Sequence, residues 1–189
     1  MTKRVLGYVI SGALSDGLRV RLSSSVPLES IKTGKFVTVV GDAYRYFSLI
    51  TDLQLEVANQ DALQFLPNGP QTILHKMICQ REMYTTAKIK PMIMLDQKNC
   101  LIPVKTIPPH LVEVTDVDAA EVALIFGKED GHGPHFCIGY PLDMNTPVCI
   151  DLERFGERSS GVFGKTGTGK TFITRLLLAG LMRYSRTAN

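Results

Sequence analysis

A glycine-rich segment late in the sequence carries the strongest signal for chemistry. Residues 164–171 read GKTGTGKT, which fits the pattern G-x-x-x-x-G-K-[ST] of a phosphate-binding loop, or P-loop. Glycines permit backbone angles that a Cβ atom would forbid, so their amides can turn inward around an anion. A helix-compatible run over residues 171–184 follows and would aim its positive dipole end at the phosphates. The segment therefore predicts a site for nucleotide phosphates.

The residues of this loop have distinct predicted roles. Lys170 would reach the β- and γ-phosphates as a point charge, and Thr171 would give a hydroxyl to Mg²⁺. These two are the predicted catalytic residues, Thr171 is the predicted metal ligand, and ATP with Mg²⁺ is the implied cofactor pair. The predicted cofactor-binding set is Gly164, Lys165, Thr166, Gly167, Thr168, Gly169, Lys170, Thr171 and Phe172.

ATP hydrolysis on such a scaffold needs more than the loop. A carboxylate on a later strand helps to hold Mg²⁺, and a further residue orients the attacking water. No Asp or Glu follows Thr171, and the helix after the loop is apolar nearly all round, as expected of a helix buried against a sheet. We therefore expect residues 1–189 to be the N-terminal piece of a longer protein. That protein is expected to hydrolyse ATP, and this chain alone is expected not to.

The sequence ahead of the loop is mainly β. Short apolar or alternating runs separated by glycine-containing turns predict strands at 5–10, 18–22, 36–40 and 44–51, a spacing typical of a small barrel or sandwich. Further strands are expected at 73–79, 89–95, 102–107, 112–114, 136–139 and 148–150, whereas 53–65 could be helix or a long loop. Asp118 and Glu121 have the spacing of a capping box, which predicts a short helix over 118–126 that ends at Gly127.

The amino-acid composition excludes several classes of protein. The 189 residues are 44% hydrophobic and 21% charged, which excludes a mainly disordered or collagen-like chain. No apolar run is long enough to span a membrane. The four cysteines form no C-x-x-C pair and occur in apolar stretches, which indicates reduced core residues and a cytoplasmic protein. The net charge of +3 is too small to indicate nucleic-acid binding by itself.

A basic and aromatic group in the first fifty residues offers a separate hypothesis of DNA contact. Basic side chains could form one face and aromatic rings could stack on bases, although alternating arginines also fit the ordinary solvent face of a strand. The residues concerned are Arg19, Arg21, Lys32, Lys35, Arg45, Tyr44, Tyr46 and Phe47.

Three segments together give the chain a family likeness. They read FCIG at 136–139, VCIDL at 148–152 and GVFGKTGTGKT at 161–171. With the β-rich module ahead of them, they resemble the HerA family of the HerA/FtsK superfamily of hexameric motor ATPases. The resemblance implies a mainly β chain, with a small HAS-type β-barrel domain over residues 1–150. The first strand, P-loop and helix of a RecA-like α/β ATPase domain would follow over 151–189.

The same resemblance implies a function. Such proteins are ATP-dependent translocases or helicases that act on double-stranded DNA in end processing or repair, as hexamers with ATP between subunits. A NurA-like nuclease would be a partner of the barrel, and the DNA contacts would lie in a part of the ATPase domain outside this chain. Two alternatives stay open. One is another P-loop machine, such as a conjugation or secretion ATPase, and the other is a non-hydrolysing barrel module for ring assembly and partner docking.

Overall fold

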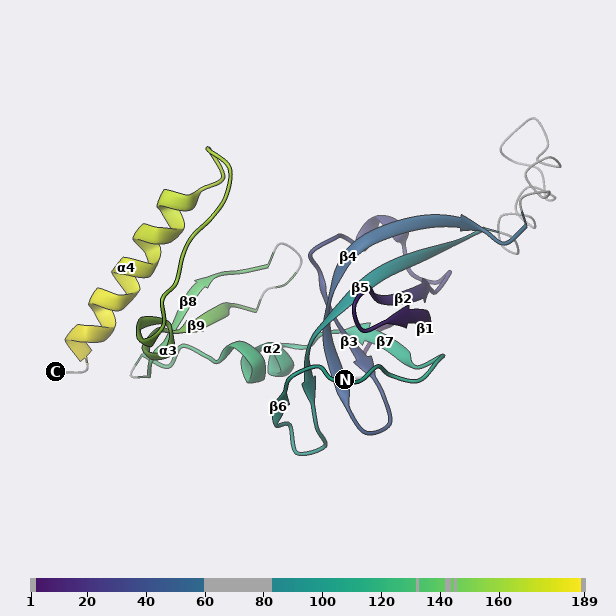
Figure 1. Ribbon diagram of the computed structural model, residues 1–189, viewed down its shortest axis with the longest axis horizontal. Helices are drawn as coiled ribbons and strands as arrows, with labels where there is room; N and C mark the ends of the chain where they lie inside the picture. The colour runs from purple at the N-terminus through teal and green to yellow at the C-terminus, as the bar shows by residue number, and fades with distance from the viewer. Residues whose placement is uncertain (1–2, 60–82, 132, 142–143, 145, 188–189) are drawn as a thin grey trace. The chain divides into compact units, whose positions relative to one another are not determined.

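The chain folds as two compact units, Met1–Val117 and Asp118–Asn189 (Figure 1). The computed structural model describes residues 3–59, 83–131, 133–141, 144 and 146–187. The strand predicted at 73–79 lies outside the described residues. The break between units falls earlier than the boundary expected at residue 150. The physical reason is that helix α2 (Ala119–Phe126) packs on strand β9 (Val148–Asp151), which places both in the second unit.

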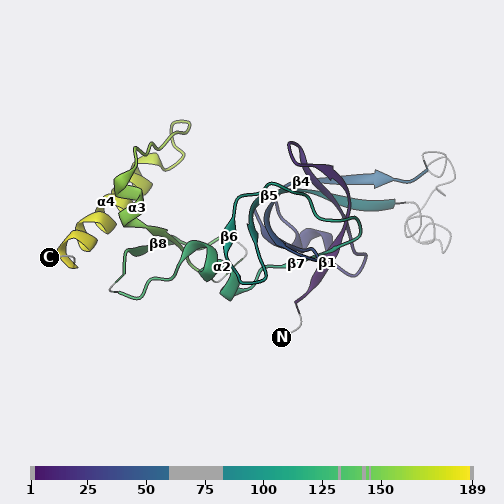
Figure 2. The same ribbon diagram turned by 60° about the horizontal axis from the view of Figure 1, so that its bottom comes forward.

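The first unit is a closed six-stranded barrel, as predicted for this part of the chain. Antiparallel strands follow one another in the order β2-β1-β7-β3-β4-β5, and pairing between β2 and β5 closes the ring. Figure 2 shows these strands curving around a common interior. The strands are β1 (Val5–Ala13), β2 (Gly17–Leu22), β3 (Phe36–Val40), β4 (Arg45–Val57), β5 (Met83–Leu95) and β7 (Glu113–Asp116). A 3-10 turn, η1 (Leu28–Ser30), connects β2 to β3.

The barrel interior is filled by alternate side chains of each strand. In β2, Leu18, Val20 and Leu22 are buried while the arginines between them face outward. The same alternation places Val37 and Val39 of β3 inside, at 0% exposure. Apolar burial of this kind is the main stabilising contribution in a small domain. The alternation that predicted the strand at 18–22 is therefore confirmed by the burial of its side chains.

Two segments depart from the predicted strand limits. Residues 53–57 are neither helix nor loop but the end of β4, because they pair with β5 from Leu53↔Ala87 to Val57↔Met83. The strand expected at 102–107 is only β6 (Leu101–Ile102), paired with the end of β5. Pro103 follows it directly and cannot donate a ladder hydrogen bond.

The proposed DNA-stacking group in the barrel is not assembled. Tyr46 and Phe47 are only 3% and 2% exposed, so neither ring is free to stack on bases. Tyr46 belongs to the barrel core, and Phe47 stacks on Phe36. Two of the basic side chains form ion pairs, Arg19 with Glu56 at 3.1 Å and Lys35 with Asp116 at 2.7 Å. The sequence pattern could not separate core rings from surface rings, because both occur in one strand.

The second unit joins a β-hairpin to three helices. Its elements are α2, β8 (His135–Gly139), β9, α3 (Leu152–Glu157) and α4 (Lys170–Thr187). The capping box of α2 is confirmed, since the Glu121 amide donates to Asp118 Oδ1 at 2.8 Å and the Asp118 amide donates to Glu121 Oε2 at 3.4 Å. Gly127 ends the helix with φ 77°, as expected.

Two described contacts hold helix α4 against strand β8 and the loop before it. Gly180 lies so close to the Phe136 ring of β8 that an added Cβ would come within 2.8 Å of it. Arg183 pairs with Glu129 at 2.9 Å, and the other carboxylate oxygen of Glu129 accepts from the Cys137 amide at 3.1 Å. The opposite side of α4 is open, with Phe172, Leu178 and Met182 exposed. The described residues therefore bury the helix on one side only. The expectation that a sheet outside this chain buries the rest of its apolar surface stays a prediction.

The described cysteines differ in how deeply they are buried. Cys149 is buried and Cys137 is half-buried, as a core role requires, whereas Cys100 is exposed on the turn before β6. The prediction of a core position is therefore wrong for Cys100, and Cys79 lies outside the described residues. Among the helices that the structure describes, none is long and apolar enough to cross a membrane.

Candidate nucleotide-binding site

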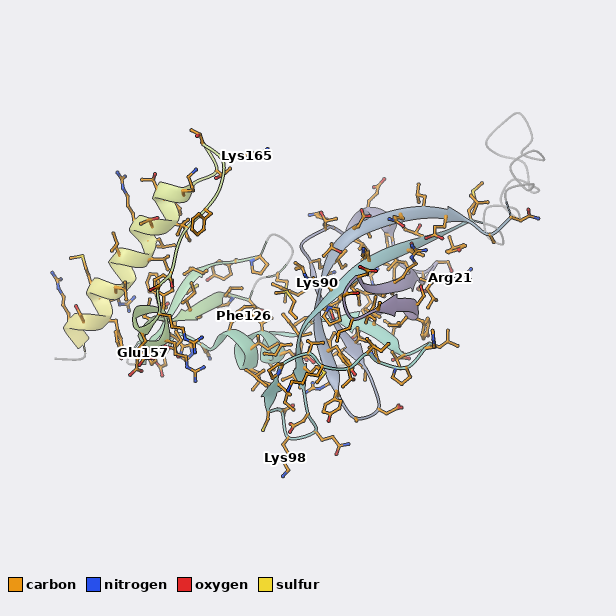
Figure 3. The ribbon with its side chains drawn as sticks, in the orientation of Figure 1. Arg21, Lys90, Lys98, Phe126, Glu157 and Lys165 are labelled. Atoms are coloured by element: carbon orange, nitrogen blue, oxygen red, sulfur yellow. The ribbon has the colours of Figure 1, made fainter. Side chains whose placement is uncertain are left out.

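The predicted P-loop connects α3 to α4. Residues 158–169 have no regular secondary structure, and Lys170 is the first residue of α4. Figure 3 shows Lys165 at the bend of this loop, beside the N-terminal end of α4. Strand β9 precedes the loop, but helix α3 lies between them because Asp151 caps it, accepting from the amides of Glu153 and Arg154. This short helix was missed in the sequence, where Asp151 and Glu153 are its only signals.

The three loop glycines are required for two different reasons. Gly167 and Gly169 have φ angles of 84° and 82°, the left-handed region that favours glycine, as predicted. Gly164 has no such angle. A Cβ atom there would instead come within 2.8 Å of Thr168 Oγ1. The prediction of a special backbone angle is thus wrong for Gly164, whose small size provides space inside the loop.

One main-chain oxygen accepts hydrogen bonds from two side chains of the loop. The Lys165 carbonyl accepts a hydrogen bond from the Thr168 hydroxyl at 2.7 Å, and the Lys170 ammonium also donates to it. The aliphatic part of Lys170 passes 3.7 Å from the position a Gly164 Cβ would take. Sequence reasoning could not find this acceptor, because every residue carries a carbonyl and only the fold selects one.

The N-terminal end of α4 carries the partial positive charge of the helix dipole. The first amides of a helix have no partner within it, and no acidic side chain lies in the first turn of α4 to offset the dipole. The first hydrogen bond of the helix ladder runs from the Ile173 amide to the Gly169 carbonyl at 3.1 Å. An anion placed before Lys170 would meet these amides and the lysine ammonium together.

The loop fits phosphate better than it fits a metal ion alone. Thr171 is exposed at the first turn of α4, so its hydroxyl is accessible to an ion. Two carboxylates of the unit have other partners, Asp151 at the α3 cap and Glu129 on Arg183. Within the described part of the chain, no three or more His, Cys, Asp or Glu side chains gather as a metal site. Mg²⁺ would therefore be held mainly by phosphate oxygens, with Thr171 adding one ligand.

The remaining predicted residues are placed as follows. Lys165, Thr166 and Thr168 are exposed on the loop, and Phe172 is 72% exposed on the first turn of α4. The structure thus places Thr168 and Lys170 beside Gly164. Phe172 makes no described contact with the loop residues that would assign it a role.

Comparison with known families agrees with this geometry. Residues 136–189 match the family model described as helicase HerA, central domain. This range begins in β8 and includes β9, α3, the P-loop and α4, so the similarity covers the part of the chain that carries the phosphate loop. The predicted resemblance to the HerA family is confirmed for these residues. No curated protein matches the chain.

Proposed function

We propose that this protein is a HerA-like ATP-dependent DNA translocase or helicase that binds ATP phosphates through residues 164–171 and acts in DNA end processing or repair. The similarity of residues 136–189 to the central domain of helicase HerA supports the ATPase class. The observation that supports the nucleotide site is the position of Lys170 at the N-terminal end of α4. Its ammonium donates a hydrogen bond to the Lys165 carbonyl of the loop.

Each residue of the loop has a task in this proposal. The ammonium of Lys170 has three donors, and the Lys165 carbonyl engages one of them, so the others can meet β- and γ-phosphate oxygens. Gly167 and Gly169 let the loop amides turn toward the anion, and Gly164 leaves room for the Thr168 hydroxyl and the Lys170 side chain. Thr171 supplies a hydroxyl to the Mg²⁺ that travels with ATP. The phosphoanhydride of ATP supplies the driving force when it is cleaved.

The proposed oligomeric assembly is based on the similarity to the HerA family. HerA-family proteins are typically oligomeric, and we propose a homo-oligomer, a hexamer, with ATP bound between subunits. Double-stranded DNA is the proposed substrate, and a NurA-like nuclease is the proposed partner of the barrel. The exposed Phe172, Leu178 and Met182 on α4 support association with further protein surface, because such side chains are costly to leave in water.

Nucleotide binding is tested by calorimetry with ATP and Mg²⁺ on the wild-type chain and two lysine variants. Lys170→Ala should lower the affinity at least about ten-fold, since charge-assisted hydrogen bonds to phosphate are lost. Lys98→Ala removes a cation from the exposed turn before β6 and should bind as the wild type does (Figure 3). Equal affinities for all three proteins would refute the proposed site.

The DNA role is tested on the protein purified from its own cells. Its intact mass is compared with the 20.9 kDa of this chain, and ATP turnover is measured with and without double-stranded DNA. DNA-stimulated turnover is the expected result. Turnover that DNA does not stimulate would favour a conjugation or secretion ATPase, and a protein of 20.9 kDa that binds ATP without turnover would favour the barrel module.

A further inference from the structure

Two cysteines of the second unit face each other across the β8–β9 hairpin. Cys137 and Cys149 are direct register partners in this antiparallel pair. The sequence indicates two separate core residues, because eleven residues lie between them and they have no C-x-x-C spacing. Only the strand pairing reveals that the two thiols are neighbours.

The hydrogen-bond pattern shows which kind of cross-strand pair they form. The Leu152 amide donates to the Pro134 carbonyl at 2.9 Å, so 134 and 152 are a hydrogen-bonded pair. Hydrogen-bonded and non-hydrogen-bonded pairs alternate along an antiparallel ladder, which makes 136–150 hydrogen-bonded and 137–149 non-hydrogen-bonded. The Cys137 amide accordingly donates to Glu129 Oε2 instead of to β9.

This geometry suits a disulfide. Non-hydrogen-bonded partners have Cα atoms about 4.5 Å apart, at the short end of the roughly 4.4–6.8 Å range that disulfides span. Together with burial, the nearby Cys137 side chain contributes to raising the pKa of the Cys149 thiol. Bridges that solvent can reach are more easily reduced than buried structural ones, and Cys137 is only half-buried.

The environments of the two thiols differ. Cys137 is half-buried, whereas Cys149 is 3% exposed and burial raises the pKa of its thiol. Cys137 is therefore the thiol that a small oxidant meets first, and Cys149 is positioned to resolve the product. Neither cysteine belongs to the phosphate loop.

We propose that Cys137 and Cys149 form a reversible oxidation site that responds to hydroperoxides. In the first step the Cys137 thiolate attacks a peroxide oxygen of H₂O₂, which yields a sulfenic acid and releases hydroxide. In the second step the Cys149 sulfur attacks the Cys137 sulfenic sulfur, the S–S bond forms, and the sulfenic oxygen leaves as water with the thiol proton. A dithiol reductant reverses the bridge by thiol–disulfide exchange.

The site lies where oxidation would affect α4. The hairpin is the surface on which this helix packs, through Phe136 against Gly180 and through Glu129 with Arg183. Glu129 also holds the Cys137 amide, so a bridge at 137 would act on the same carboxylate that anchors α4. The proposal does not depend on the identity of the nucleotide or of the DNA substrate.

The test counts alkylated cysteines in one tryptic peptide. Residues 129–154 contain both Cys137 and Cys149 and no internal Lys or Arg, while residues 99–105 contain Cys100 alone and serve as a matched control. The folded chain is treated with H₂O₂, quenched, then denatured in the presence of an alkylating reagent and digested. Peptide 129–154 should lose two hydrogens and accept no alkyl group, and dithiothreitol should restore two alkyl groups.

Three comparisons make the test decisive. The bridge should form at least about ten-fold faster in the folded chain than in urea, because the fold holds the two thiols together. In Cys149→Ala the Cys137 sulfenic acid should persist and be captured by dimedone, whereas the wild type should yield little of this adduct. The proposal is overturned if peptide 129–154 keeps two alkyl groups while Cys100 is oxidised, or if folded and unfolded chains form the bridge at equal rates.

Discussion

The ammonium of Lys170 donates a hydrogen bond to the main-chain carbonyl of Lys165, five residues earlier, and so spans the loop that precedes α4. Thr168 donates its hydroxyl to the same carbonyl. One oxygen therefore fixes two side chains of the loop, and its neighbour Gly164 is held against both of them. A phosphate that enters the loop would compete with this oxygen for the lysine.

Gly164→Ala is expected to weaken ATP binding by crowding Thr168, and not by straining the backbone. The new Cβ would lie 2.8 Å from Thr168 Oγ1, so adding Thr168→Ala should relieve part of the loss. Gly167→Ala places a side chain at φ 84° and should not be relieved by Thr168→Ala. Calorimetric titration of the single and double variants distinguishes the two causes. Equal behaviour of both glycine variants would contradict the assignment.

Gly180→Ala is expected to destabilise the second unit although it lies inside a helix. In an open helix this change stabilises by roughly 0.5–1 kcal/mol, but here the Cβ would meet the Phe136 ring at 2.8 Å, and overpacking of this kind costs about 1–3 kcal/mol. Gly156→Ala in α3 has nothing within 4 Å and serves as the control that should not destabilise. Urea unfolding measures both. A gain in stability for Gly180→Ala would show that the Phe136 ring can move away from the added Cβ atom at little cost.

Asp118→Ala is expected to lower the unfolding free energy by about 1 kcal/mol, the usual contribution of an N-cap. The carboxylate accepts from the Glu121 amide at 2.8 Å, and Ala offers no acceptor. Asp118→Asn keeps a capping oxygen and should retain most of the stability. Thermal unfolding followed by circular dichroism compares the three proteins, and identical losses for Ala and Asn would point to charge and not to the cap.

The raised pKa of Cys149 predicts a pH dependence of stability. Burial keeps this thiol protonated in the folded state, whereas the unfolded thiol ionises near pH 8.5. Unfolding then releases a proton in alkaline solution, so the contribution of Cys149 is complete at neutral pH and declines as pH rises. The destabilisation caused by Cys149→Ala should therefore be smaller at about pH 10 than at about pH 7. Urea unfolding under reducing conditions provides the comparison, and a constant difference would argue against burial as the cause.

The 189-residue chain is expected to bind ATP without steady turnover. No Asp or Glu follows Thr171, and the described carboxylates Asp151 and Glu129 are engaged in the α3 cap and with Arg183. A carboxylate for Mg²⁺ and a group to orient water are both needed for hydrolysis. Phosphate release is measured for the wild type and Lys170→Ala. Wild-type turnover above background that Lys170→Ala abolishes would contradict this expectation.

The sequence alone determined those parts that depend on local chemistry. The order of residues 164–171 predicted the loop and the helix behind it, because glycine, lysine and threonine at this spacing have few other uses. Alternation over 18–22 predicted a strand with one buried face, and Asp118 with Glu121 predicted a capped helix. In each case the deciding interaction joins residues only a few positions apart.

Only the tertiary structure decided which distant groups meet. Pairing of β2 with β5 closes the barrel, and packing on the two faces of β4 buries both Tyr46 and Phe47, which no local pattern could specify. Pairing of β8 with β9 brings Cys137 and Cys149 together across eleven residues, and packing of α4 places Gly180 against Phe136. The physical reason is that strand register and helix packing follow from burial of the whole apolar surface at once. The contacts of a single residue therefore depend on segments far from it in the chain.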